Sequence, residues 1–229
     1  MGLTPVKTPW LVKRLFSDYI WDMPSSEKVI YLTFDDGPTP QITNWTLNIL
    51  KQYNAKATFF CIGNNIEKHP DIFKNILEAG HAIGNHTQNH IKGWKTNTED
   101  YLRDIKWCES VLKSTISNSG FKVQNSSIVN NECLITNLFR PPYGLITPKQ
   151  GKALVNLGYK IIMWDVLSFD WENAVERDQC LKNVRNNSTA GSVIVFHDSF
   201  KASNNMQYAL PKFLKHFSEK GYRFDTLKL

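Results

Sequence analysis

The sequence predicts an α/β fold, in which a largely parallel sheet of about seven strands is covered by helices. Short apolar runs rich in β-branched and aromatic residues alternate with segments of helical periodicity along almost the whole chain, as expected for repeated strand–helix–strand units. The chain has 229 residues, 41% of them hydrophobic, and no break in composition. These features favour one domain with a sizeable core.

The elements follow one another in regular alternation. The predicted strands span residues 29–34, 56–62, 81–84, 138–140, 160–165, 192–197 and 222–224. Helical periodicity, usually closed by Gly or Asn, appears at residues 42–53, 71–79, 99–113, 149–156, 177–184 and 208–220. These helices would be the crossovers between parallel strands.

Two segments depart from this alternation. Residues 28–229 form the predicted domain, and residues 1–27 are expected to be an N-terminal extension packed on it. The stretch 9–16 is briefly amphipathic and could contact a membrane surface, but a helix packed on its own domain is the preferred interpretation. Residues 114–137 are crowded with Ser and Asn, so we expect a surface insertion there.

Composition narrows the classes of partner and compartment. The net charge of +6 is spread along the chain, so nucleic acid is not an expected partner. No stretch approaches the roughly 18 apolar residues of a membrane span, and no signal-peptide core is recognised. The expectation is therefore a cytoplasmic chain, monomeric by default, with association with the cell envelope as the alternative. The four cysteines lie far apart and are expected to be buried free thiols.

Unusual polar residues end or follow several predicted strands. They are Asp35, Asp36, His86, His90, Arg140, Asp165 and His197. A closed parallel barrel would bring all of them to one rim, whereas an open sheet would gather them at one edge. The closed arrangement accounts for more of them at once.

The histidine pair is the first candidate metal site. In the run His86-Thr87-Gln88-Asn89-His90, the spacing would let a helical turn bring both imidazoles to one side, and neutral imidazole is a common zinc ligand. Two surface histidines with no shared role remain the alternative interpretation of this pair.

Two adjacent carboxylates end the first predicted strand. Asp35 and Asp36 follow the apolar run 29–34 and precede Gly37-Pro38, so an ordinary acidic turn is one interpretation. Neighbouring side chains point in different directions, which favours different roles for the two acids. One can bind a metal beside the histidines, while the other takes a proton from an activated water.

Three motifs together resemble those of a known family. Residues 33–38 (TFDDGP), 86–90 (HTQNH) and 140–144 (RPPYG) are similar in order and spacing to motifs of the polysaccharide deacetylases, also called the NodB-homology or carbohydrate esterase family 4 enzymes. The resemblance covers residues 28–224. It implies a distorted (β/α) barrel and hydrolysis of the N-acetyl group on N-acetylglucosamine units of chitin or peptidoglycan.

The resemblance also implies residue roles. Asp35 would be the general base, oriented by Arg140, and the backbone N–H of Tyr143 would help to stabilise the oxyanion. The metal ligands would be Asp36, His86 and His90. Zinc is the expected ion, with cobalt and nickel as alternatives.

The later motifs match less closely. His197, in Val195-Phe196-His197, resembles the general acid, although a core histidine is the alternative. Asp170-Trp171 resembles a pair in which the acid tunes that histidine and the tryptophan walls the acetyl pocket. Leu167 stands where the family often has aspartate, which leaves the histidine's partner open between Asp170 and nearby acids, namely Asp165 and Asp198. Substrate contacts are expected from Pro142, Tyr143 and Trp171.

Removal of the N-acetyl group from an N-acetylated carbohydrate is the favoured function. A related metal amidase acting on a small non-sugar amide and an O-acetyl esterase acting on xylan are the alternatives. A metal-dependent carbohydrate-binding domain without catalysis is disfavoured, because a binder has no need of Asp35, Arg140 and His197. Acetate release from several substrate classes would discriminate among these functions.

Overall fold

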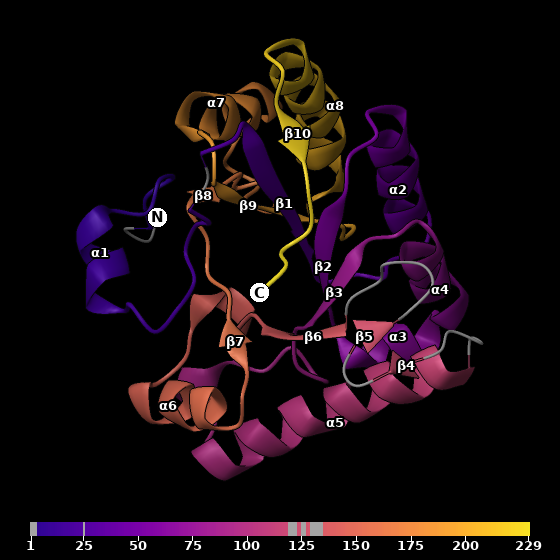
Figure 1. Ribbon diagram of the computed structural model, residues 1–229, viewed down its shortest axis with the longest axis vertical. Helices are drawn as coiled ribbons and strands as arrows, with labels where there is room; N and C mark the ends of the chain where they lie inside the picture. Colours follow the sequence, from indigo (N-terminus) through magenta and orange to yellow (C-terminus); the bar gives the residue numbers. More distant parts are fainter. Residues whose placement is uncertain (1–3, 25, 119–122, 125–126, 129–134) are drawn as a thin grey trace.

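A curved sheet of parallel strands forms the centre of the computed structural model, which describes residues 4–24, 26–118, 123–124, 127–128 and 135–229 (Figure 1). The strand order is β7-β6-β3-β2-β1-β9-β8, and every neighbouring pair is parallel. The bounds are β1 (Val29–Asp35), β2 (Ala57–Cys61), β3 (Ala82–Asn85), β6 (Ile135–Phe139), β7 (Lys160–Ile161), β8 (Val166–Leu167) and β9 (Val193–His197). A further short strand, β10 (Arg223–Phe224), pairs with the start of β1. The predicted distorted (β/α) barrel is confirmed.

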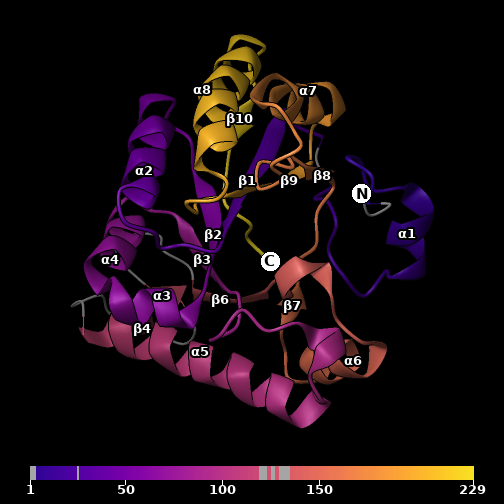
Figure 2. The same cartoon turned by 180° about the vertical axis from the view of Figure 1, so that it is seen from behind.

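Helices surround this sheet, and the view from behind shows the same ring (Figure 2). Their bounds are α1 (Trp10–Leu15), α2 (Ile42–Gln52), α3 (Gly63–Lys68), α4 (Pro70–Glu78), α5 (Thr98–Asn118), α6 (Pro148–Asn156), α7 (Arg177–Asn187) and α8 (Ser203–Glu219). All six predicted crossover helices are present. The short helix α3 was not predicted, because its sequence Gly63-Asn64-Asn65 opens with residues typical of a loop.

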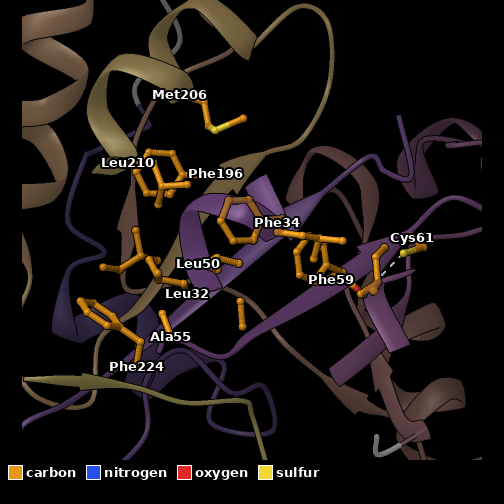
Figure 3. Packing of buried hydrophobic residues seen from close by; sticks show 14 of the residues in the cluster. Leu32, Phe34, Leu50, Ala55, Phe59, Cys61, Phe196, Met206, Leu210 and Phe224 are labelled. Atoms are coloured by element: carbon orange, nitrogen blue, oxygen red, sulfur yellow. Dashed lines mark hydrogen bonds between the residues drawn. The ribbon is translucent and has the colours of Figure 1, made fainter. Parts of the chain in front are cut away.

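Alternation along the strands separates the core from the barrel interior. Phe34 of β1 stacks between Phe59 of β2 and Phe196 of β9, with ring centroids 5.0 and 6.1 Å apart, beneath α8 (Figure 3). The residues that alternate with them, such as Asp35 and His197, therefore point into the barrel. Because successive side chains of a strand point to opposite faces, the phenylalanines pack under the helices and the polar residues next to them face the interior of the barrel at its rim.

The sheet does not close on itself between β7 and β8, and the N-terminal segment lies in that gap. Lys7 forms an antiparallel bridge with Val166, and Ile20 forms a parallel bridge with Ile162. The strand predicted at 160–165 is shorter than expected, because β7 ends at Ile161 and residues 162–165 lead to β8 at the other edge of the sheet. The run looks like a single strand in the sequence, but Lys160 and Ile161 pair with β6, whereas the N–H of Asp165 donates to the carbonyl of Val193 in β9.

Asp165 consequently lies outside the group of polar residues at the rim. Its carboxylate accepts hydrogen bonds from Lys7 at 2.7 Å, Lys13 at 2.5 Å and Ser192 at 2.6 Å. The acid thus fastens the N-terminal segment to the sheet. Helix α1 itself has no buried residue, and its Trp10 is 68% exposed.

The predicted insertion lies only partly within the described residues. Helix α5 continues to Asn118, so residues 114–118 are helical. Strands β4 (Val123–Gln124) and β5 (Ser127–Ile128) form an antiparallel pair, and the remainder of residues 119–134 lies outside the described part. Cys108 and Cys180 are buried free thiols, as expected, Cys61 is also buried, and Cys133 is among the residues not described. Among the residues described, no helix is long and apolar enough to cross a membrane.

Candidate active site

The cluster of three candidate metal ligands lies where β1 and β3 end. Asp36 directly follows β1, and its Oδ1 lies 3.8 Å from Nε2 of His86 and 3.3 Å from Nε2 of His90. One ligand atom from each of the three residues falls within 4.8 Å of the other two. The structure thus brings together the carboxylate and both imidazoles that the motifs singled out.

The loop that carries the two histidines is not helical, so the expected helical turn is wrong. Thr87 and His90 have positive φ angles of 67° and 54°. The amide of Thr87 donates to the side chain of Asn85 at 2.8 Å, and those of Gln88 and Asn89 donate to Asp104 at 2.8 and 3.1 Å. Side chains therefore satisfy the loop amides that a helix would satisfy with its own carbonyls.

Both imidazoles are neutral near pH 7, as metal binding requires. Nδ1 of His86 lies 2.8 Å from the carbonyl oxygen of Arg140 and donates to it, so Nε2 presents its lone pair toward Asp36. Burial lowers the pKa of His86, and burial together with the neighbouring His86 lowers the pKa of His90 to about 4. One carboxylate and two neutral imidazoles fit a divalent ion such as zinc.

Asp35 is held by a wholly buried arginine. Nη1 of Arg140 donates to Oδ1 of Asp35 at 2.7 Å and to Oγ1 of Thr33 at 2.6 Å. Nε and Nη2 donate to the carbonyls of Ile162 at 3.1 Å and Met163 at 2.8 Å. Burial alone would raise the pKa of Asp35, but the charge of Arg140 and its hydrogen bond leave that pKa below the usual value. The carboxylate is therefore ionised at neutral pH.

His197 lies at the end of β9 with Asp170 as its partner. Nδ1 of His197 lies 2.8 Å from Oδ1 of Asp170, and the His197 amide donates to Oδ2 at 2.7 Å. Burial lowers the pKa of His197, but Asp170 outweighs it and raises the value to about 9. The structure thus pairs His197 with Asp170 rather than with Asp165 or Asp198. The indole of Trp171 lies edge-on to the imidazole of His197, with ring centroids 4.6 Å apart.

Tyr143 lies beside the candidate metal ligands. It follows the buried Pro142 in a short 3₁₀ turn and has a positive φ of 60°. Its ring lies 4.7 Å from that of His90, and Nζ of Lys92 lies 4.5 Å above the ring centroid. Gly144 follows with φ of 67°, and a Cβ there would lie 2.3 Å from Trp164. The turn therefore depends on left-handed backbone conformations at Tyr143 and Gly144, and the packing of Trp164 leaves no room for a side chain at Gly144.

A cavity of about 460 Å³ joins these groups. Its lining includes Asp35, Asp36, His86, His90, Tyr143, Trp171 and His197. Arg140, Asp170 and Pro142 are buried behind this lining. A larger hollow of about 690 Å³ lies between α2 and α4, but the candidate metal ligands do not line it.

Sequence reasoning missed part of the cavity wall. Leu167, Phe169 and Val195 add apolar surface beside Trp171, and Lys201 adds a cation. The departure at Leu167 from the family's usual aspartate was the one available signal for this wall. Nothing in the local sequence marked Phe169, which has a positive φ of 59°.

Comparisons with known proteins agree with the resemblance read from the motifs. The sequence model of the polysaccharide deacetylase family matches residues 22–162. A peptidoglycan-N-acetylglucosamine deacetylase of Bacillus cereus is 34% identical over 214 residues, which cover 90% of each chain. The peptidoglycan-N-acetylmuramic acid deacetylase PdaC of Bacillus subtilis is 28% identical over 88% of this chain and 38% of its own length.

The fold is also close to that of a solved relative. A crystal structure of a peptidoglycan N-acetylglucosamine deacetylase in complex with 4-naphthalen-1-yl-N-oxidanyl-benzamide superimposes with a TM-score of 0.81. The two sequences are 35% identical, and the match covers 96% of this chain and 95% of the other.

Proposed function

Because the chain belongs to the polysaccharide deacetylase family, we propose that it hydrolyses the N-acetyl group of N-acetylglucosamine units in a glycan of the peptidoglycan or chitin type. The proposal rests on the observation that three groups of catalytic type lie around one cavity. A metal-ligand cluster, an arginine-held carboxylate and an aspartate-held histidine have the chemical functions that amide hydrolysis requires.

The cluster of Asp36, His86 and His90 would hold a divalent ion, with zinc as the expected one and cobalt or nickel as alternatives. When bound, such an ion supplies Lewis-acid polarisation and lowers the pKa of water. The neutral state of both imidazoles supports this assignment, as does the hydrogen bond that fixes the His86 tautomer.

Asp35 is proposed as the general base. Its carboxylate stays ionised because Arg140 contacts it inside a buried site, so it can accept the proton of the attacking water. Arg140 also fixes the orientation of the carboxylate, since its Nε and Nη2 are themselves held by the backbone carbonyls of Ile162 and Met163.

His197 is proposed as the acid that protonates the leaving amine. With a pKa raised to about 9 by Asp170, its imidazole carries a proton at neutral pH. The backbone N–H of Tyr143 would donate to the oxyanion of the tetrahedral intermediate. Trp171 and Tyr143 would contact the sugar and its acetyl group, and the buried Pro142 would fix the turn that carries Tyr143.

The substrate class is drawn from the relatives whose names refer to peptidoglycan. Such a substrate belongs to the cell envelope, so we propose that the enzyme works there. One chain is proposed as the functional unit, because its own residues supply the metal ligands, base and acid.

The test measures acetate release by zinc-loaded protein from four substrates: peptidoglycan strands, chitin oligosaccharides, acetylated xylan and a simple acetamide. We expect release from the first two, and Asp35→Asn should abolish it while the protein still binds zinc. Asp165→Asn, which alters a buried acid outside the cavity, should remain active. Release from acetylated xylan alone or from the acetamide alone would instead support an O-acetyl esterase or a small-amide hydrolase.

A further inference from the structure

The backbone of Asp36 has a conformation that needs support from its surroundings. Its φ angle is 80°, in the left-handed region that non-glycine residues rarely adopt. The direction of the Asp36 side chain depends on this conformation. A left-handed residue persists where neighbouring groups hold the peptide units on both of its sides.

Asp198 contacts both of those peptide units. Its backbone N–H donates to the carbonyl of Asp35 at 3.2 Å, which holds the peptide before Asp36. Its Oδ1 accepts from the N–H of Gly37 at 3.1 Å, which holds the peptide after Asp36. One residue therefore restrains φ and ψ of Asp36 together.

The carboxylate of Asp198 is itself fixed. It has no exposed surface, and its Oδ2 accepts from Oγ1 of Thr43 at 2.5 Å. Oγ1 of Thr43 in turn accepts from the amide of Thr39 at 2.7 Å. A Cβ on Gly37 would lie 2.1 Å from Oδ2 of Asp198, so this close approach requires glycine. The packing leaves little room for the carboxylate to move.

The far side of the turn is held by other elements. Nδ2 of Asn65 in α3 donates to the carbonyl of Asp36 at 2.7 Å, and the amide of Ile62 donates to the carbonyl of Gly37 at 3.0 Å. The peptide unit between Asp36 and Gly37 thus forms two side-chain hydrogen bonds: its oxygen accepts from Asn65, and its N–H donates to Asp198. Removal of Asp198 would free one end of that peptide.

We propose that Asp198 is a positioning residue that holds the Asp36 carboxylate toward His86 and His90. The proposal rests on the proposed function, since it takes Asp36 as a metal ligand. Asp198 itself does not line the cavity, so it acts through the Gly37 amide and the Asp35 carbonyl. Its loss should weaken metal binding without removing a ligand.

The experiment compares Asp198→Ala with Asp198→Asn and with Asp165→Ala as a matched buried-acid control. The metal-free proteins are titrated with zinc in a calorimeter, and exchange of the Gly37 amide is followed by NMR without metal. Asp198→Ala should lose zinc affinity by about 10- to 100-fold and expose the Gly37 amide to exchange. Asp198→Asn, which retains an acceptor for Gly37 and gains a donor toward Thr43, should recover most of both.

The control separates positioning from general destabilisation. Asp165→Ala removes a carboxylate that binds two lysines, so it should lower the melting temperature yet keep wild-type zinc affinity. If Asp198→Ala does not fold, Thr43→Val removes one hydrogen bond from the same carboxylate and should weaken zinc binding by about fivefold. Wild-type zinc affinity in whichever of these two variants folds would overturn the proposal, as would a protected Gly37 amide in Asp198→Ala.

The two proposals fail in different ways. If wild-type protein binds no divalent ion and releases no acetate, the proposed function fails. Loss of Gly37 protection in Asp198→Ala would then still show that Asp198 holds the turn. If wild-type protein binds zinc and releases acetate while Asp198→Ala does so with unchanged affinity, only the positioning role of Asp198 is wrong.

Discussion

Nη1 of Arg140 lies 2.7 Å from Oδ1 of Asp35, and the arginine side chain has no exposed surface. Burial of two charges is unfavourable unless their remaining polar atoms are satisfied. Here the same guanidinium donates to Thr33 and to the carbonyls of Ile162 and Met163. The pair is therefore part of a connected network that crosses the barrel interior, and both partners should be sensitive to substitution.

Replacement of this arginine tests the network. Lysine carries a single ammonium group and cannot serve the carboxylate, the threonine and two carbonyls at once. We expect Arg140→Lys to reduce kcat for acetate release by about 100-fold or more and to lower the free energy of unfolding by roughly 3 kcal/mol. Acetate assays and urea denaturation measure the two effects. Arg223→Lys, at an exposed pair with Glu27, should change neither, and wild-type kcat in Arg140→Lys would contradict the role of Arg140.

Metal removal tests the ligand cluster. A chelator should abolish acetate release, and added zinc should restore it. Zinc that binds only the folded protein raises the melting temperature, so we expect this rise for the wild type and its loss in His90→Gln. His216→Gln, which changes a half-buried histidine on α8 outside the cavity, should keep the full rise. An equal rise in all three proteins would place the ion elsewhere.

The pH dependence of the reaction tests the proposed acid. Burial lowers the pKa of His197, but Asp170 raises it to about 9, and a nearby bound cation would bring it somewhat lower. An acid must be protonated, so kcat/KM should fall as pH rises through this pKa. Asp170→Asn removes the carboxylate charge and should shift the alkaline limb down by about one pH unit or more. An unchanged limb would mean that His197 is not the acid.

His81 is a buried histidine outside the cavity, and its shifted pKa should make the stability of the protein depend on pH. Burial and the charge of Lys56 lower its pKa from 6.5 to about 3. Between these pH values the unfolded chain binds a proton that the folded chain does not, so stability is fully present above about pH 6.5 and falls as pH decreases. The loss should reach up to roughly 4 kcal/mol near pH 3.

Urea unfolding of His81→Gln between pH 7.5 and 4 measures this contribution. The variant should show a shallower loss of unfolding free energy on acidification than the wild type, whatever its stability at pH 7.5. His216→Gln should change the dependence much less than His81→Gln, because His216 is only half-buried and its pKa is lowered less strongly than that of His81. Parallel curves for His81→Gln and the wild type would contradict the shifted pKa.

Much of the fold was predictable because the strands follow local patterns. The run before Asp35 is apolar and β-branched, and the registers that bring Asp35 beside His197 follow from parallel pairing of β1 with β9. The residues proposed as metal ligands, base and acid could thus be placed at one rim from sequence alone. The partner of His197 could not, because three acids were available and only the packing of the chain selects Asp170.

The features that sequence missed depend on distant contacts. The strand predicted at 160–165 ends at Ile161, and beyond it the chain pairs with the N-terminal segment, Ile162 with Ile20 and Val166 with Lys7. The histidine loop adopts left-handed conformations because Asp104 binds its amides. Asp198 lies 161 residues from Gly37, and no local pattern links an acid to a turn at that separation.

Leu167 forms part of the cavity wall at a position where the family often has aspartate. Its side chain is 3% exposed, so Leu167→Ala should lower the free energy of unfolding by about 2–4 kcal/mol. The added space beside Val195 and Trp171 should admit a longer acyl group. We therefore expect the ratio of kcat/KM for N-propionyl to N-acetyl chitin oligosaccharides to rise about tenfold, as for one methylene in an apolar pocket. Leu181→Ala, which truncates a buried leucine of α7 outside the cavity, should lose comparable stability with an unchanged ratio. An unchanged ratio in Leu167→Ala as well would mean that this wall does not contact the acyl group.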